Sequence, residues 1–194
     1  MNERRRRNRI DRVTTKSGDA GETSLADGHR YPKHHSKIEL TGALDEANTF
    51  IGALAEETDV SVTERLRVLQ ARLFDLGAVV ATGHSDIDWH ALAANLDQDT
   101  AKLNARLEPL REFILPGGGL AAAAAHVARA AVRRAERAWW AAADESSDLA
   151  DTGAGVFLNR LSDHLFVLAR TLADTEVLWE PLKRQSPDVP EKPA

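Results

Sequence analysis

Apolar residues recur at intervals of three and four positions along most of this chain, which is the spacing of one buried face of an α-helix. The repeats are Leu40, Leu44, Ala47, Ile51 and Leu54; Val62, Leu66, Leu69, Leu73 and Leu76; Leu96, Leu103, Leu107 and Leu110; and Leu158, Leu161, Leu165, Leu168 and Leu172. An alanine-rich run over residues 120–143 predicts a further helix whose small side chains allow close packing. Because no stretch alternates as a strand does, the pattern predicts an all-α fold, a single bundle of five helices.

Turn and cap residues predict where these helices begin and end. Ser61 followed by Glu64 matches a capping box, and residues 116–119, a proline and three glycines, break the chain before the alanine-rich run. The first 37 residues are rich in Gly, Asp, Ser, Thr and Lys and predict an ordered loop. We therefore expect a flexible basic arm over 1–11, one domain over 12–182 and a flexible tail over 183–194.

Composition narrows the class of protein. The chain has 194 residues, of which 43% are hydrophobic and 28% charged, as in a soluble single domain. It has no cysteine, which removes disulfides and thiolate metal sites and suits the cytoplasm. A net charge of -5 argues against a nucleic-acid partner, and no apolar run reaches the roughly 18 to 20 residues of a membrane span. None of the seven histidines completes a Glu-x-x-His pair, so we expect no metal site built from His or Cys.

The glycine-rich segment over residues 14–25 is the first candidate for chemistry. Its glycines allow tight curvature, their amides can face an anion, and Lys16 adds a positive charge. The segment lacks the spacing of a P-loop. Taken alone, the segment is explained better by an ordinary Gly/Asp turn.

The helix predicted over residues 120–143 carries the second candidate. His126, Arg129, Arg133, Glu136 and Arg137 share one face, and like charges at i and i+4 disfavour an isolated helix. This arrangement indicates an anionic partner for the arginines, although a solvated arginine face explains the spacing equally well. Glu136 could hold Arg133 or Arg137 in place.

Other polar residues extend this candidate site. Asp45, Glu46 and Asn48, on the first predicted helix, could supply the carboxylates that the arginines need. Asn159 and Asp163 lie one helical turn apart beside the last leucine repeat.

Six segments in this order resemble the PduO-type ATP:cob(I)alamin adenosyltransferases. They are residues 15–21, 42–48, 73–78, 113–118, 126–137 and 158–166, and the likeness covers about residues 12 to 180. The resemblance implies a five-helix bundle of the cobalamin adenosyltransferase-like type with an ordered N-terminal loop. It also implies a homotrimer with active sites between subunits.

The implied reaction transfers the 5′-deoxyadenosyl group of ATP to the cobalt of cob(I)alamin and releases triphosphate. ATP and cobalamin are then substrates, and Mg²⁺ is expected through the ATP phosphates. The resemblance assigns ATP binding to Thr14, Thr15, Lys16, Ser17, Gly18, Gly21, Lys33, Arg133, Glu136 and Asn159. It assigns cobalamin binding to Phe113, Asp45, Arg129, Asp163 and Phe166. Arg133, Glu136, Arg129 and Asp45 become the catalytic set, with Asp45 paired to Arg129 across the subunit interface. A reductase and a cobalamin-dependent acceptor enzyme are further expected partners.

Some positions depart from the family pattern, and other classes of function stay open. Gly119 stands where the family often has Ser or Thr, which predicts a slightly looser turn, and Glu22 and the His34–His35 pair are less usual. One alternative is a non-catalytic bundle that uses its arginine face for assembly. Others are a nucleic-acid module using residues 4–7 with the helix arginines, and a different ATP-using enzyme on the same bundle.

Overall fold

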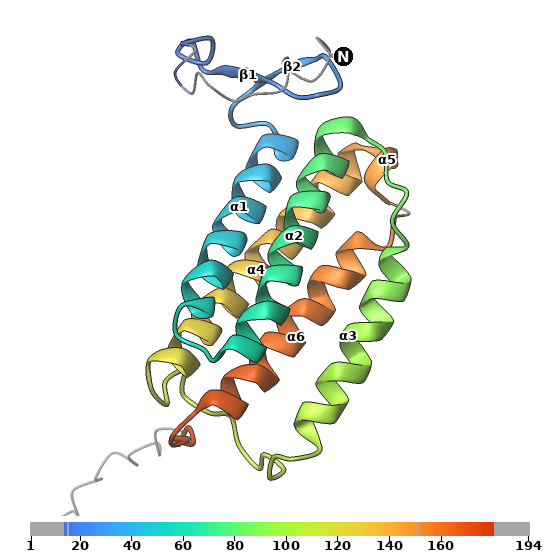
Figure 1. The fold of residues 1–194 in the computed structure, drawn as a ribbon. Helices are drawn as coiled ribbons and strands as arrows, with labels where there is room; N and C mark the ends of the chain where they lie inside the picture. Colours follow the sequence, from blue (N-terminus) through green and yellow to red (C-terminus); the bar gives the residue numbers. More distant parts are fainter. Residues whose placement is uncertain (1–13, 15, 151, 181–194) are drawn as a thin grey trace, which may run out of the picture.

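The structure, a computed structural model, describes residue 14, residues 16–150 and residues 152–180. Five long helices lie side by side in one bundle (Figure 1): α1 (Ser36–Ala55), α2 (Val60–Thr82), α3 (Trp89–Asn104), α4 (Leu120–Glu145) and α6 (Ala154–Leu172). A single turn, α5 (Ser147–Ala150), joins α4 to α6. The predicted all-α, five-helix bundle is confirmed. The arm predicted over 1–11 and the tail predicted over 183–194 lie outside the described residues, as do residues 12, 13, 15, 151, 181 and 182 of the predicted domain.

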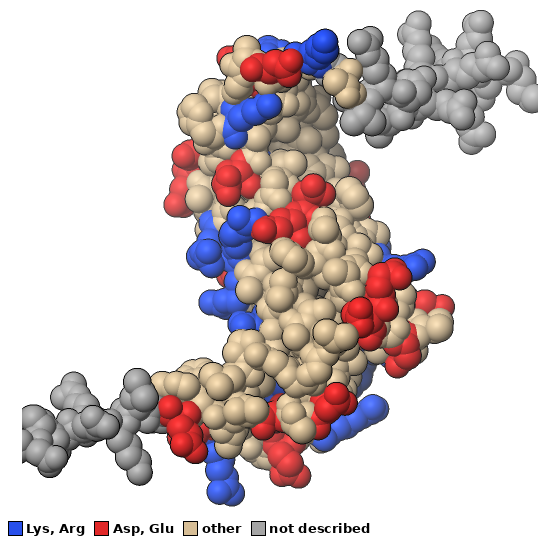
Figure 2. Space-filling model, turned by 90° about the vertical axis from the view of Figure 1, so that its left-hand side faces the viewer, with Lys and Arg blue, Asp and Glu red and all other residues tan. Residues whose placement is uncertain are grey.

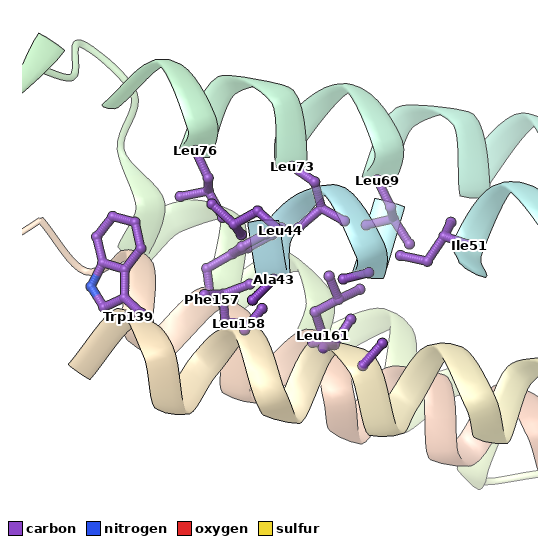
Figure 3. Packing of buried hydrophobic residues seen from close by; sticks show 14 of the residues in the cluster. Ala43, Leu44, Ile51, Leu69, Leu73, Leu76, Trp139, Phe157, Leu158 and Leu161 are labelled. Carbon is purple, nitrogen blue, oxygen red and sulfur yellow. The ribbon is translucent and has the colours of Figure 1, made fainter. Parts of the chain in front are cut away.

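The leucine repeats meet in one core. α4 packs against both α1 and α6, while α2 covers α1 and α3 covers α6. In Figure 3, Leu69, Leu73 and Leu76 of α2 point toward Leu44 and Ile51 of α1. Burying one such side chain contributes about 1.5–3 kcal/mol. Within the described residues, no helix is both long enough and apolar enough to cross a lipid bilayer.

Two helix boundaries differ from the sequence prediction. α2 is capped by Asp59, whose carboxylate Oδ1 accepts hydrogen bonds from the amides of Ser61 and Val62 at 2.8 and 3.1 Å. The capping box at Ser61 was therefore wrong, because a carboxylate two residues earlier already satisfies these free amides. α3 ends at Asn104, so Leu107 and Leu110 lie beyond the helix that their spacing suggested.

The N-terminal segment contains a small hairpin that the sequence analysis missed. Strands β1 (Glu22–Ser24) and β2 (Arg30–Pro32) pair antiparallel beyond the start of α1 (Figure 1). The amide of Asp27 donates to the carbonyl of Ala81 at 2.8 Å, which ties the hairpin to the end of α2. Strands of three residues are too short to show alternation, so the expectation of no strand was wrong here.

The turn before α4 contacts the chain that follows α6. Gly118 and Gly119 have φ angles of 94° and 106°, which favour glycine. A Cβ on Gly119 would lie 2.8 Å from a carboxylate oxygen of Asp174, and the Asp174 amide donates to the Gly118 carbonyl at 2.9 Å. No side-chain hydrogen bond caps α4 at Gly119, so the slightly looser turn stays a prediction.

Candidate functional site

A cavity of about 260 Å³ brings together residues from three separate parts of the chain. Phe113 comes from the link between α3 and α4, Arg129 and Arg133 come from α4, and Asp163 and Phe166 come from α6. Four of the five residues assigned to cobalamin thus line one cavity. Each helix contributes residues three or four positions apart, because that spacing repeats on one helical face.

Phe113 is unusual among the large apolar side chains. Its exposed fraction is 79%, although apolar residues elsewhere in the bundle are mostly buried. Phe113 is therefore not a core residue. An aromatic ring held at a cavity mouth and open to solvent is suited to contact a large apolar ligand.

Two buried polar atoms beside this cavity lack hydrogen-bond partners among the described residues. They are His126 Nδ1 and Arg129 Nε. Burial, and then the charge of Arg133, lowers the pKa of Arg129 from its ordinary value. A buried donor without an acceptor costs free energy, so Arg129 Nε indicates an acceptor beyond those that the described residues of one chain supply.

Glu136 of α4 and Asn159 of α6 form a hydrogen-bonded pair beside the residues that line the cavity. Asn159 Nδ2 donates to Glu136 Oε1 at 3.0 Å, and Arg160 Nη1 donates to Asn159 Oδ1 at 2.8 Å. Arg160 is in turn paired with Asp97 of α3 at 2.9 Å. Since a carboxylate only accepts and a guanidinium only donates, the orientation of the Asn159 amide is fixed.

This pairing corrects one expectation and reveals a missed residue. Glu136 makes no ion pair with Arg133 or Arg137 within the described residues. Arg160 was not singled out from the sequence, because its role depends on Asp97 of a distant helix.

Asp45 lies apart from the other residues assigned to cobalamin. It lines a cavity of about 200 Å³ between α1 and α2, together with Gly42 and Phe74. Its neighbour Glu46 pairs with Arg134 of α4, so α1 does supply a carboxylate to an arginine, but not to Arg129. Within one chain Asp45 and Arg129 are not brought together.

The N-terminal residues assigned to ATP form a compact loop against β2. The amide of Lys33 donates to the Gly21 carbonyl at 2.9 Å, and a Cβ on Gly18 would lie 3.3 Å from Lys33 Nζ. Lys16 adopts a positive φ of 59°. Thr14 is exposed, and Thr15 lies outside the described residues.

Arg30 joins this loop and was also missed from the sequence. Its guanidinium donates to the Ser17 carbonyl at 3.3 Å and pairs with Glu22 at 3.2 Å. The pairing of β1 with β2 places Arg30 at this loop, and strands this short have no recognisable pattern in the sequence. With Lys16 and Lys33, Arg30 gives the loop three cationic side chains that a phosphate group could contact, beside the carboxylates of Asp19 and Glu22.

Within one chain, the N-terminal loop does not lie at the cavity lined by Phe113. Neither residue 14 nor any of residues 16–33 lines the cavity, and the hairpin lies beyond one end of the bundle (Figure 1). Across the part of the chain that the structure describes, no cluster of three or more His, Asp or Glu side chains could hold a metal ion.

Two buried histidines predict how stability depends on pH. His126 and His164 are 5% and 7% exposed, and burial lowers the pKa of both from the ordinary 6.5. The charge of Arg129 lowers the pKa of His126 further, and the charge of Glu176 raises it. At His164, the charge of Asp99 raises the pKa and that of Arg65 lowers it. The unfolded chain then binds more protons than the folded chain once the pH drops below 6.5.

We therefore expect the melting temperature to fall as the pH drops from about 7 to about 5. The lowered pKa of Asp59 removes stability only below its ordinary 3.8, outside this window. In His164→Asn, the melting temperature should fall less steeply with pH than in the wild type. In His34→Asn, which changes an exposed ring, it should fall as steeply as in the wild type. Equal slopes for wild type and His164→Asn would contradict the assignment.

Comparisons with known proteins identify the family. The cobalamin adenosyltransferase family matches residues 13–172 of this chain. A cobalamin adenosyltransferase of Cupriavidus metallidurans is 41% identical over 179 residues, covering 89% of this chain and 96% of that protein. A corrinoid adenosyltransferase of Mycobacterium tuberculosis is 38% identical over 182 residues, covering 89% of this chain and 94% of that protein.

Solved structures agree. A phenylalanine-to-alanine variant of the PduO-type ATP:corrinoid adenosyltransferase from Lactobacillus reuteri, complexed with cobalamin and ATP, matches with a TM-score of 0.79 at 27% identity. The match covers 88% of this chain and 100% of that one. An arginine-to-lysine variant of the same enzyme, complexed with ATP, matches with a TM-score of 0.77 at 28% identity. The chain thus belongs to the PduO-type family of corrinoid adenosyltransferases.

Proposed function

We propose that this ATP-dependent cobalamin adenosyltransferase carries out its reaction in the cavity between Phe113 and the arginines of α4. The 5′-deoxyadenosyl group of ATP passes to the cobalt of cob(I)alamin, and triphosphate is released. One observation carries the placement: an exposed aromatic ring and two arginines, from distant segments, line a single cavity of about 260 Å³.

The reaction needs no protein nucleophile. The cobalt(I) electron pair attacks the 5′ carbon of ATP, the bond from that carbon to the triphosphate oxygen breaks, and its electrons leave with the triphosphate. The protein must hold the 5′ carbon facing cobalt and stabilise the charge that develops on the leaving group. Arg133 and Lys16 are the side chains that we assign to this charge.

The N-terminal loop supports binding of the triphosphate. Lys16 and Lys33 lie in the same loop as Gly18 and Gly21, with Arg30 beside it. Mg²⁺ would be bound through the ATP phosphates and would neutralise part of their charge.

Phe113 is assigned to the lower face of the corrin. An apolar ring there excludes water or a base from the axial position and leaves cobalt(II) four-coordinate. Cobalt(II) then loses an axial donor that would stabilise it relative to cobalt(I), so reduction becomes easier. Phe166 and His126, whose rings lie 6.1 Å apart, would support the same side of the ligand.

The complete site requires more than one chain, and we propose the homotrimer as its assembly. Arg129 has a buried nitrogen without an acceptor, and Asp45 has no ion-pair partner among the described residues. Phe74 of α2, beside Asp45, is 69% exposed. In the side view of Figure 2, a broad area without charged side chains lies next to basic side chains gathered along one edge. These features support an interface in which Asp45 of one subunit faces Arg129 of the next.

Asp45→Ala tests this interface. Removing one member of a buried, hydrogen-bonded pair costs about 2–5 kcal/mol, so we expect the trimer to dissociate at concentrations where the wild type stays assembled. Glu46→Ala is the matched control, since Glu46 pairs with Arg134 within its own chain at a half-exposed site. Sedimentation velocity over a dilution series measures both. An unchanged assembly of Asp45→Ala would remove the predicted pair.

Anaerobic incubation with cob(I)alamin and Mg-ATP tests the function. We expect adenosylcobalamin and intact triphosphate in equal amounts. Release of pyrophosphate or phosphate instead would indicate a different ATP-using enzyme. Stabilisation by Mg-ATP in a melting experiment is also expected, and its absence would favour a non-catalytic bundle. A reductase, a cobalamin-dependent acceptor enzyme and a cytoplasmic location stay predictions from the sequence.

A further inference from the structure

Phe113 sits in a link without regular secondary structure, yet the backbone on both sides of its ring is held. The amide of Leu115 donates to the Val177 carbonyl at 2.8 Å, and the amide of Trp179 donates to the Phe113 carbonyl at 2.6 Å. These bonds form an antiparallel bridge between Ile114 and Leu178. The segment after α6 therefore provides the backbone partner of Phe113.

A second contact ties the same two segments together closer to α4. The amide of Asp174 donates to the Gly118 carbonyl at 2.9 Å. A Cβ on Gly118 would lie 2.8 Å from both the Cβ of Ala173 and the carbonyl oxygen of Thr175. Such a close approach leaves little room for the link to shift independently of residues 173–179.

Residues 173–179 are themselves anchored by an ion pair between a buried arginine and a partly exposed glutamate. Arg170, in the last turn of α6, donates from Nε to Glu176 Oε1 at 2.7 Å and from Nη2 to Glu176 Oε2 at 3.2 Å. Nη2 also donates to the carbonyl of Glu108, in the link itself, at 2.9 Å. The Arg170 side chain is only 5% exposed. A two-pronged guanidinium–carboxylate contact fixes direction as well as distance.

Such a pair is better suited to fixing register than to adding stability. The cost of removing the Arg170 charge from water offsets much of the attraction between the two groups, so the pair adds little net stability. In a paired, extended backbone, however, a slip of one residue turns every side chain to the opposite face. With Glu176 held at Arg170, Val177 must face Leu115 and Trp179 must face Phe113, which directs the Phe113 ring to the cavity.

We propose that Arg170 and Glu176 are positioning residues of the adenosyl transfer, acting through residues 173–179 to set the placement of Phe113. This inference rests on the proposed role of Phe113 at the corrin face. Neither residue lines the cavity of about 260 Å³, so neither is expected to touch cobalamin or ATP.

The test compares Glu176→Ala, Glu176→Gln and Arg170→Lys with wild type. Without the pair, kcat/KM for cobalamin should fall about tenfold to a hundredfold, because misplacement by about 1 Å costs this much, while KM for ATP stays within about twofold. The absorption signature of four-coordinate cobalt(II) should weaken in the same order as the activity. Glu176→Gln, which keeps one acceptor oxygen, should lie between Glu176→Ala and wild type.

Two readouts separate this role from general destabilisation. Hydrogen exchange of the amides in 108–118 should accelerate in Glu176→Ala, with exchange in α1 and α2 unchanged; global acceleration would show unfolding, and Glu176→Gln then decides the outcome. Lys102→Gln, which breaks an exposed ion pair with Asp99, is the control and should alter none of these quantities. Unchanged exchange in 108–118 for all three variants would overturn the proposal.

A double variant distinguishes this inference from the role of Phe113 itself. In a Phe113→Ala background, Glu176→Ala should cause no further loss of cobalamin turnover, because the ring to be positioned is gone. Additive losses would overturn the proposal. If Phe113→Ala alone left turnover and the cobalt(II) spectrum intact, the proposed function of Phe113 would fail, whatever the exchange data show about the anchor.

Discussion

Arg133→Ala is expected to lower kcat by about a hundredfold to a thousandfold. Removing one preorganised donor to a developing negative charge costs about 2.7–4 kcal/mol in comparable sites. Arg133 lines the cavity with Phe113 and Arg129, and its side chain has no ion-pair partner among the described residues. Its charge is therefore available for the departing triphosphate. Anaerobic turnover with cob(I)alamin and Mg-ATP measures the effect.

The neighbouring arginine provides a matched control. Arg134→Ala removes an equal charge from the next position of α4, but Arg134 already pairs with Glu46. We expect its turnover to stay within about twofold of wild type, as for a half-exposed pair. Equal losses in Arg133→Ala and Arg134→Ala would mean that the general charge of α4 matters, rather than one placed donor. Arg133→Lys should fall between the two, since it keeps the charge without the planar fork.

Phe113→Ala is expected to have its largest effect when cobalamin is supplied as cobalt(II). Loss of the ring admits an axial ligand, cobalt(II) is stabilised and its reduction becomes harder. Turnover from cobalt(II) with a chemical reductant should fall about a hundredfold, the scale set by misplaced reacting groups. Turnover from prereduced cob(I)alamin should fall much less, because the reduction step is bypassed.

Stability measurements keep this test specific. Phe113 is 79% exposed, so its truncation should change the melting temperature little. Phe157→Ala, at a core position that is 2% exposed, should cost about 3–5 kcal/mol by comparison. Equal activity losses from the two cobalt oxidation states would place Phe113 in substrate binding alone and remove its role in reduction.

The helices were predictable where several residues of one repeat indicated the same structure. Each buried stripe depends on four or five apolar side chains at a fixed period, so one misleading residue does not change the result. The predicted ends of the helices depended on single residues, and these predictions were wrong more often. Asp59 replaced Ser61 as the cap of α2, and Leu107 continued the spacing of α3 after the helix had stopped.

Some residues of the candidate site were likewise predictable from the sequence, and others were not. Arg129, Arg133 and Asp163 were named from helical spacing and resemblance, and the structure places them around one cavity. Arg30 and Arg160 were missed, because their contacts depend on a strand pairing and on a third helix. No local pattern in the sequence reports a partner that lies 60 or more residues away, as Asp97 does from Arg160.

The sequence by itself determined the class of fold, the family and the face of each long helix that is buried. It could do so because helical period and ordered motifs are local properties of the chain. Only the tertiary structure decided that Phe113 is exposed, that Glu136 binds Asn159 rather than an arginine, and that residues 173–179 hold the link bearing Phe113. Those outcomes depend on which segments the fold brings together, and that choice is made by the packing of the whole core.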